Sequence, residues 1–159
     1  MNDLIWLGKT AGPVGLKGEI KFISDNNHLD KLLTPTSILY IDNKEYIIKT
    51  SRVFKNNYII SFKDYENINL IDSLLNKDAY IKRANTKLSS DEFLYSELLN
   101  YSVYEDDKLL GKVEEILLNK NSILIKCDGI IIPLIDKYVD HIDNNQLKVF
   151  VKDIKELRI

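Results

Sequence analysis

The chain has 159 residues, of which 45% are hydrophobic and 29% are charged, and its formal net charge is −2. This is the composition of a soluble globular protein, and the length allows one domain or two small ones. No apolar run approaches the roughly 18 residues of a membrane-spanning helix, and the N-terminus lacks the basic and apolar segments of a signal peptide, so we expect a cytoplasmic protein with no membrane partner.

Short runs rich in Ile, Val, Tyr and Phe dominate the first half of the chain and predict strands. Turn residues separate them, among them the pairs Asp42-Asn43 and Asn56-Asn57, which is typical of hairpins in an antiparallel sheet or barrel. Apolar residues at helical spacing between 68 and 75 predict a short helix before a strand over 79–82. The other predicted strands are residues 3–10, 18–24, 37–42, 44–54 and 57–64.

A polar stretch predicts a linker over residues 85–91, between a first domain over 1–84 and a second over 92–159. In the second domain, one or two helical turns precede another series of strands, and Asp128-Gly129 is the strongest hairpin turn pattern in the chain. The expected fold is therefore all-β, with two small antiparallel β-barrels joined by a short linker and minor helical turns. The predicted strands are residues 101–106, 108–119, 122–127, 130–136 and 146–152.

The stretch GKTAGPVGLKGEIKF, residues 8–22, holds four of the six glycines, so a phosphate-binding loop has to be considered. Such a loop opens a helix, but here a strand pattern begins directly after Gly18, which argues against a nucleotide site. A strand–turn–strand is the better interpretation, because proline fixes φ and glycine tolerates a positive φ or a close backbone contact. The residues assigned to this turn are Gly8, Gly12, Pro13, Gly15 and Gly18.

Groups suited to catalysis are scarce. Cys127 is the only cysteine, which excludes an internal disulfide and a metal site built from several thiolates, and it reads as strand packing. His28 and His141 are far apart and have no neighbouring nucleophile, so surface or capping roles are favoured. We expect no catalytic site, no metal and no cofactor.

The glycine-rich stretch resembles the N-terminal motif of the bacterial RimM family of ribosome maturation factors. Val14 stands where the family usually has histidine, which puts any role for an imidazole in this turn in doubt. Leu110-Gly111-Lys112-Val113 and the aromatic segment around Phe93 resemble the start of the family's C-terminal PRC-barrel domain, although a leucine, Leu94, stands where the family has an aromatic residue. The matching residues of the first motif are Gly8, Lys9, Gly12, Pro13, Gly15, Lys17, Gly18, Glu19 and Lys21.

The resemblance implies a monomeric assembly factor rather than an enzyme. It would bind the immature small (30S) ribosomal subunit and ribosomal protein S-nineteen, and assist the processing and folding of 16S rRNA. The alternative from another class is a small flavin-binding β-barrel oxidoreductase, since the N-terminal barrel resembles some reductase domains. Absorbance near about 450 nm would favour that alternative, but no separate nucleotide module is found.

Charge is unevenly spread between the halves, which indicates either two domains with different partners or ordinary scatter. Residues 1–90 carry 13 Lys+Arg and 10 Asp+Glu (+3), and residues 91–159 carry 9 and 14 (−5). Lys9, Lys17 and Lys21 are candidate rRNA contacts, although they could equally be solvating lysines. An acidic half attracts basic proteins, and aromatic rings dominate protein interfaces, although Phe93 could instead anchor the core. The candidate contacts to the ribosomal protein are Phe93, Tyr95, Asp106, Asp107, Glu114 and Glu115.

Overall fold

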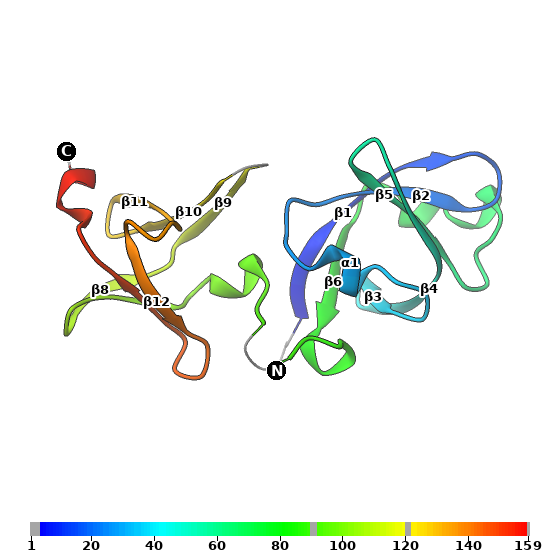
Figure 1. Ribbon diagram of the computed structural model, residues 1–159. Helices are drawn as coiled ribbons and strands as arrows, with labels where there is room; N and C mark the ends of the chain where they lie inside the picture. Colours follow the sequence, from blue (N-terminus) through cyan, green and yellow to red (C-terminus); the bar gives the residue numbers. More distant parts are fainter. Residues whose placement is uncertain (1–3, 90–91, 120–121, 159) are drawn as a thin grey trace. The chain divides into compact units, whose positions relative to one another are not determined.

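The computed structural model describes residues 4–89, 92–119 and 122–158, and the chain divides into two compact units, Met1–Leu88 and Ser89–Ile159 (Figure 1). We call them unit 1 and unit 2. Strands dominate both, so the all-β expectation is confirmed. No helix within the described ranges is long and apolar enough to cross a membrane. Residues 90 and 91 of the expected linker lie outside these ranges.

Six strands of unit 1 pair in the order β1-β2-β5-β4-β3-β6 and close into an antiparallel barrel, because β6 pairs back onto β1 (Figure 1). Alternate side chains face inward, and branched and aromatic residues such as Ile20, Phe22 and Ile60 fill the interior. The strands are β1 Leu4–Val14, β2 Glu19–Ile23, β3 Ile38–Ile41, β4 Lys44–Phe54, β5 Asn57–Phe62 and β6 Asp78–Lys82.

The two longest strands, β1 and β4, each carry a register shift part-way along. In the pairing of β1 with β2 the shift lies between Thr10 and Pro13, and in the pairing of β4 with β5 it lies between Ile48 and Thr50. Irregularities of this kind bend a strand. Together with β2 and β5, these two strands form a four-stranded section of the barrel, β1-β2-β5-β4, which we call the wall.

Short helical segments connect the strands of unit 1. A single turn of α-helix, α1 (Leu29–Leu32), follows β2, and the 3₁₀ turn η3 (Arg83–Asn85) follows β6. Where the sequence predicts one short helix, the structure has two 3₁₀ turns, η1 (Ile68–Leu70) and η2 (Asp72–Leu74). Buried Ile71 and Leu74 are three residues apart, and that spacing matches the three-residue repeat of a 3₁₀ turn.

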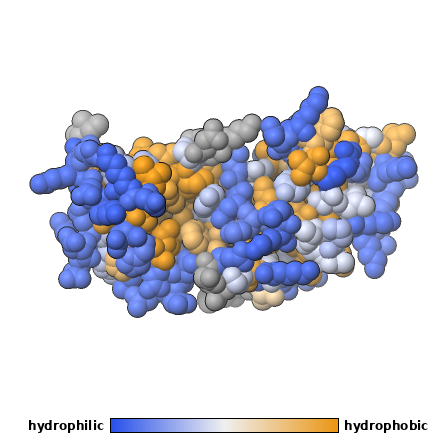
Figure 2. Space-filling model, viewed as in Figure 1, coloured by the Kyte–Doolittle hydropathy of each residue, from blue (hydrophilic) through white to orange (hydrophobic). Residues whose placement is uncertain are grey.

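Seven strands of unit 2 form two sheets around one apolar core, in the orders β11-β10-β9 and β12-β13-β7-β8. The 3₁₀ turns η4 (Tyr95–Leu98) and η5 (Ile154–Leu157) flank them. Figure 2 shows one face of the molecular surface, on which polar residues cover much of the area and apolar residues lie between them. The strands are β7 Ser102–Glu105, β8 Lys108–Lys112, β9 Glu115–Asn119, β10 Ser122–Cys127, β11 Ile130–Pro133, β12 Val139–Asp143 and β13 Lys148–Val151.

One strand pair in unit 2 departs from the expected antiparallel arrangement. β13 runs parallel to β7, with Val149 opposite Val103, and both valines are fully buried. Parallel neighbours need a long connection, and here β8 to β12 provide it. The pairing places two apolar strands side by side at the centre of the four-stranded sheet.

Among the described residues, two-residue turns with positive φ at both positions close three hairpins. Asp42-Asn43 and Asp128-Gly129 both have positive φ at their two positions, as the sequence predicts for turns that match the twist of a hairpin. In the third hairpin the turn is Lys55-Asn56, with φ of 49° and 67°, one residue earlier than the predicted pair. Asn57 is paired with Phe54 instead, which makes Asn57 the first residue of β5.

Candidate nucleic-acid interface

The glycine-rich segment forms the end of β1, a loop over residues 15–18 and the start of β2. Val14 pairs with Glu19, so the chain reverses across these four residues. Gly15 has φ 71° and Gly18 has φ 80°, in the left-handed region that strains residues with a Cβ atom. Between the two glycines the loop exposes Leu16 and Lys17 to solvent, and Leu16 is 76% exposed.

The end of this loop lies against the segment that follows β5. A Cβ atom on Gly18 would overlap the carbonyl oxygen of Tyr65 and lie 2.9 Å from the backbone nitrogen of Asn67. The Ile68 N–H donates a hydrogen bond of 3.0 Å to the Leu16 carbonyl oxygen. The loop is therefore fixed to the barrel at two neighbouring points.

The other two glycines of the stretch differ from each other. A Cβ atom on Gly8 would lie 2.7 Å from the Ile23 carbonyl oxygen and from the Phe22 ring, so β1 and β2 approach closely there. A Cβ atom on Gly12 would meet nothing within 4 Å. Gly12 also lacks a positive φ, so nothing in the barrel requires a glycine at that position.

The outer face of the wall collects basic side chains. Residues directly opposite each other in antiparallel strands lie on the same face of a sheet. Lys21 of β2 is opposite Ile59 of β5, and Ile59 is opposite Arg52 of β4. The neighbours of Lys21, Ile20 and Phe22, are buried in the interior, so Lys21 and Arg52 face outward, while Ile59 between them is covered and only 5% exposed.

A second outward row lies two residues further along the strands. Lys9 of β1 is opposite Ile23 of β2, and Asn57 of β5 is opposite Phe54 of β4. Alternation along each strand puts these residues on the same outer face as Lys21. Ile23 is 46% exposed and Phe54 is 49% exposed, so the basic face also presents apolar surface.

The lysines around this face have no direct ion-pair partner among the described residues, although Asp78 of β6 is opposite Lys9. Lys9, Lys17, Lys21 and Lys55 are exposed, and no carboxylate of the described residues forms an ion pair with any of them. Arg52 differs, because its Nε and Nη2 donate hydrogen bonds of 3.2 Å each to the two carboxylate oxygens of Glu19. Those bonds raise the pKa of the Arg52 guanidinium and tie β4 to the start of β2.

The β4–β5 hairpin ends in an aromatic residue beside a lysine. The Lys55 Nζ lies 5.3 Å from the centroid of the Phe54 ring, within the range of a cation–π contact. Val53, the preceding residue, is 62% exposed and faces the other side of the hairpin, since it is opposite Tyr58. Burial and the nearby charge of Asp30 raise the pKa of Tyr58.

The structure brings two of the three sequence-predicted lysines, Lys9 and Lys21, onto one face and leaves Lys17 in the adjoining loop. Sequence reasoning missed three residues of this surface, which are Arg52, Phe54 and Lys55. An aromatic residue and two basic residues next to an exposed hairpin turn were a usable signal. Their alignment with Lys21 depends on the pairing of β2 with β5, which the sequence does not reveal.

The candidate residues in unit 2 lie in several places. Phe93 packs against the core of unit 2, and Tyr95 is half-buried at the start of η4. Asp106 and Asp107 are exposed in the β7–β8 turn. The other two acids, Glu114 and Glu115, follow the far end of β8, and at about 3.3 Å per residue the two pairs cannot form one cluster.

Glu114 also has a local role in unit 2. Its carboxylate accepts a hydrogen bond of 3.1 Å from the backbone N–H of Asp128, at the turn between β10 and β11. The adjoining Cys127 is buried, and burial, followed by the charges of Asp128 and Glu114, raises the pKa of its thiol. Cys127 is therefore strand packing, as its position in the sequence suggests.

A row of aromatic residues crosses the four-stranded sheet of unit 2, on the face opposite the core. His141 is opposite Phe150, and Phe150 is opposite Tyr104, which in turn is opposite Leu109. The His141 and Phe150 rings stack with centroids 4.3 Å apart, and Leu109 is 55% exposed. The row ends beside the turn that holds Asp106, so apolar and acidic groups meet at the β7–β8 hairpin.

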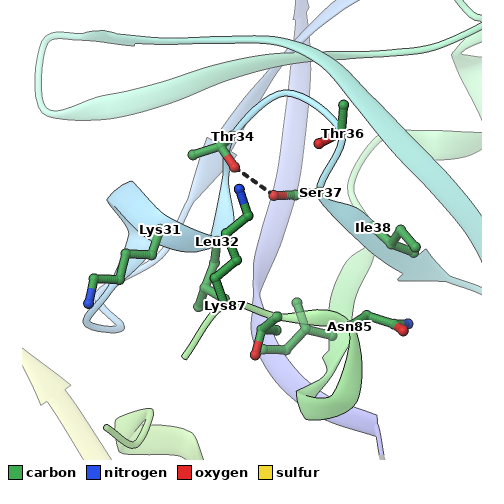
Figure 3. Close-up of a pocket in the computed structure, with 10 residues that line it drawn as sticks. Lys31, Leu32, Thr34, Thr36, Ser37, Ile38, Asn85 and Lys87 are labelled. Atoms are coloured by element: carbon green, nitrogen blue, oxygen red, sulfur yellow. Dashed lines mark hydrogen bonds between the residues drawn. The ribbon is translucent and has the colours of Figure 1, made fainter. Parts of the chain in front are cut away.

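A small pocket on unit 1 is lined largely by hydroxyl and amine groups (Figure 3). Thr34 and Ser37 share a hydrogen bond of 2.8 Å between their hydroxyl oxygens there. Its volume of about 60 Å³ suits a few water molecules and is well below the roughly 300 Å³ at which small-molecule sites begin. The lining residues are Lys31, Leu32, Thr34, Thr36, Ser37, Ile38, Ile81, Asn85, Thr86 and Lys87.

Comparison with known proteins places this barrel in a family. Residues 5–86 match the family model for the RimM N-terminal domain. A ribosome maturation factor RimM from Ligilactobacillus salivarius is 32% identical over 157 residues, covering 92% of this chain and 94% of that protein. The chain belongs to the RimM family. The resemblance of the glycine-rich motif to RimM is thereby confirmed.

Other RimM proteins are similar over most of this RimM-family chain. One from Bacillus subtilis is 30% identical over 162 residues, covering 92% of this chain and 91% of that protein. A crystal structure of a 16S ribosomal RNA processing protein RimM from Pseudomonas aeruginosa covers 94% of this chain and 97% of its own, with 20% identity and a TM-score of 0.48. The RimM family model spans the glycine loop and the whole wall.

Proposed function

We propose that this chain is a cytoplasmic, monomeric ribosome maturation factor that binds immature small ribosomal subunits and assists 16S rRNA processing and folding. Family membership and the names of the curated relatives support this proposal. The observation that carries it is the outer face of the wall, where Lys9 and Lys21 lie on the same face and neither forms an ion pair with a residue that the structure describes. Lysines of this kind contact RNA phosphates.

The proposed action is binding without covalent chemistry. A protein that binds one arrangement of rRNA more tightly than the others increases the population of that arrangement. Contacts between lysines and phosphates provide affinity but carry no sequence information, so a second contact has to position the factor. Unit 2 is the candidate for that contact.

We propose that unit 2 binds ribosomal protein S-nineteen, whose surface is basic because it binds rRNA. Residues 89–159 carry 9 Lys+Arg and 14 Asp+Glu, a net charge of −5, which is complementary to such a partner. The β7–β8 hairpin adds exposed Leu109 to the acids of its turn. The contact residues that we propose are Phe93, Tyr95, Asp106, Asp107, Glu114 and Glu115.

Sedimentation of cell lysate on a gradient tests the proposed function. The full-length chain should co-migrate with free small subunits and be absent from assembled ribosomes. Replacing Lys9 and Lys21 with Gln should weaken this co-migration and make it less sensitive to salt, because fewer phosphate contacts remain. A matched variant with Lys44→Gln and Lys63→Gln, two exposed lysines elsewhere on unit 1, should behave like the unmodified chain. Absence of the unmodified chain from the small-subunit fractions would refute the proposal.

A further inference from the structure

The tip of the β4–β5 hairpin presents an aromatic ring that the barrel does not use for packing. Phe54 is 49% exposed, whereas the barrel's buried phenylalanines, Phe22 and Phe62, are 1% and 0% exposed. The turn that follows Phe54 is tight, with positive φ at both Lys55 and Asn56, so the ring stands on a short and well-defined hairpin end.

The ring lies on the basic side of the hairpin. Phe54 and Arg52 are two residues apart on β4 and share the outer face, and Lys21 lies across β5 from Arg52. Lys55 approaches the ring at 5.3 Å from its centroid. Val53, which is also exposed, faces the opposite side with Tyr58. Aromatic surface and positive charge therefore coincide on one face only.

We propose that this face binds single-stranded RNA, with an unpaired base stacked on Phe54 and the adjoining phosphates bound by Lys21, Lys9 and Lys55. The inference rests on the proposed function and names the kind of RNA that the wall recognises. Four-stranded sheets with exposed aromatic residues seat about two or three unpaired bases in other RNA-binding modules. A paired helix keeps its bases stacked inside and would offer phosphates to the lysines but no base to the ring.

The positive charge of this face favours RNA over a basic ribosomal protein as its partner. Lys9, Lys17, Lys21 and Lys55 surround it; of the nearby carboxylates, Glu19 is engaged by Arg52, and Asp78 of β6 is opposite Lys9 without forming an ion pair with it. A basic ribosomal protein would be repelled, whereas a phosphate backbone is attracted. The lysine contacts release counterions, and each adds about 0.7 to the salt dependence of single-strand binding.

Fluorescence anisotropy with the full-length chain tests the proposal. The probes are a labelled mixed-sequence RNA of about ten nucleotides and the same strand annealed to its complement. The chain should bind the single strand more tightly than the duplex. Phe54→Leu keeps an apolar side chain but removes the ring, and should weaken single-strand binding about tenfold while leaving duplex binding unchanged. Phe54→Tyr should retain the affinity.

The matched control is Val53→Ala, on the other side of the same hairpin, which should leave both affinities unchanged. The double variant with Lys9→Gln and Lys21→Gln should weaken both probes and lower the salt slope for the single strand by about 1.4. Equal binding of the two probes, binding of neither, or an unaltered affinity for Phe54→Leu overturns the inference. If the unmodified chain still sediments with immature subunits in such a case, the proposed function stands without it.

Discussion

At the scale of single residues, four glycines in one stretch occupy four different environments. Gly18 combines φ 80° with backbone atoms too close for a Cβ atom, and Gly8 has the close contact without the positive φ. Gly15 has φ 71° but open space around it, and Gly12 has neither constraint. The order of these constraints gives a graded prediction for the free energy of unfolding.

Replacing each of three glycines with alanine should separate these effects. Gly18→Ala should cost about 3 kcal/mol or more, because left-handed strain adds to overlap with the Tyr65 carbonyl. Gly15→Ala should cost about 1 kcal/mol from strain alone. Gly12→Ala should be neutral or slightly stabilising. Chemical denaturation of the full-length chain measures all three, and a loss for Gly12→Ala as large as that for Gly18→Ala would contradict the geometric explanation.

At the scale of elements, one carboxylate adds a polar contact to η5, whose Ile154 is buried in the core of unit 2. Glu156 accepts a hydrogen bond of 2.6 Å from the Tyr138 hydroxyl and pairs with Lys137 at 2.8 Å. The Lys137 and Tyr138 hydrogen bonds lower the pKa of Glu156, and the same contact raises the pKa of Tyr138. The C-terminal 3₁₀ turn is thereby fastened to the segment that precedes β12.

This contact should make the free energy of unfolding of unit 2 depend on pH in the acidic range. A carboxyl group with a lowered folded pKa contributes stability above its unfolded pKa of about 4.3, and the contribution is lost as the pH falls through the folded pKa. The melting temperature should therefore fall between about pH 5 and about pH 3, and Glu156→Gln should make that fall shallower. Glu115→Gln, an exposed acid in β9, is the control and should change the profile less. Identical profiles for all three chains would show that the contact contributes nothing to stability.

Local patterns in the sequence predict elements better than they predict pairings. Asp128-Gly129 identifies its hairpin because a two-residue turn fixes the register of its own two strands. The segment over 68–75 carries helical spacing but forms 3₁₀ turns, since buried Ile71 and Leu74 dock without a further turn of helix. The parallel pairing of Val103 with Val149 joins distant parts of the chain, and no local pattern encodes it.

The candidate site likewise combines residues that a local sequence pattern predicts with residues that only the strand pairing brings together. The spacing of Lys9, Lys17 and Lys21 is visible in one glycine-rich motif, so the sequence predicts them as a set. Phe54 and Arg52 reach the same face through β5, which lies between β2 and β4 in the barrel. Recognising that neighbourhood requires the strand order, which is set by packing across the barrel.

At the scale of the whole molecule, opposite charge is divided between the units. Residues 1–88 carry 13 Lys+Arg and 10 Asp+Glu (+3), and residues 89–159 carry 9 and 14 (−5). The formal net charge of −2 is therefore the sum of two unlike halves, for which we propose different partners. Binding to RNA and binding to a basic ribosomal protein should be separable by mutation.

Two full-length variants test that separation. Lys9→Gln with Lys21→Gln should weaken RNA binding and leave binding to S-nineteen unchanged. Asp106→Lys with Asp107→Lys should slow association with S-nineteen and reduce its salt sensitivity, because exposed charges act mainly on the on-rate. The same variant should retain RNA binding. Surface plasmon resonance with both ligands measures the four combinations, and loss of both partners in either variant would argue against a division of labour between the units.

The parallel pairing of β7 with β13 sets an order of events during translation. Every strand of the unit 1 barrel has been synthesised by residue 82, but β7, which pairs first with β8, gains its second neighbour only when residues 148–151 have been added. At about 5–20 residues per second, the nascent barrel has a lead of roughly 3–14 s, longer than many small domains need to fold. The half that we propose to hold RNA is therefore complete while the other half still lacks the central strand β13, and a ribosome stalled late in this interval would display a finished barrel followed by a β7–β8 hairpin with one unpaired edge.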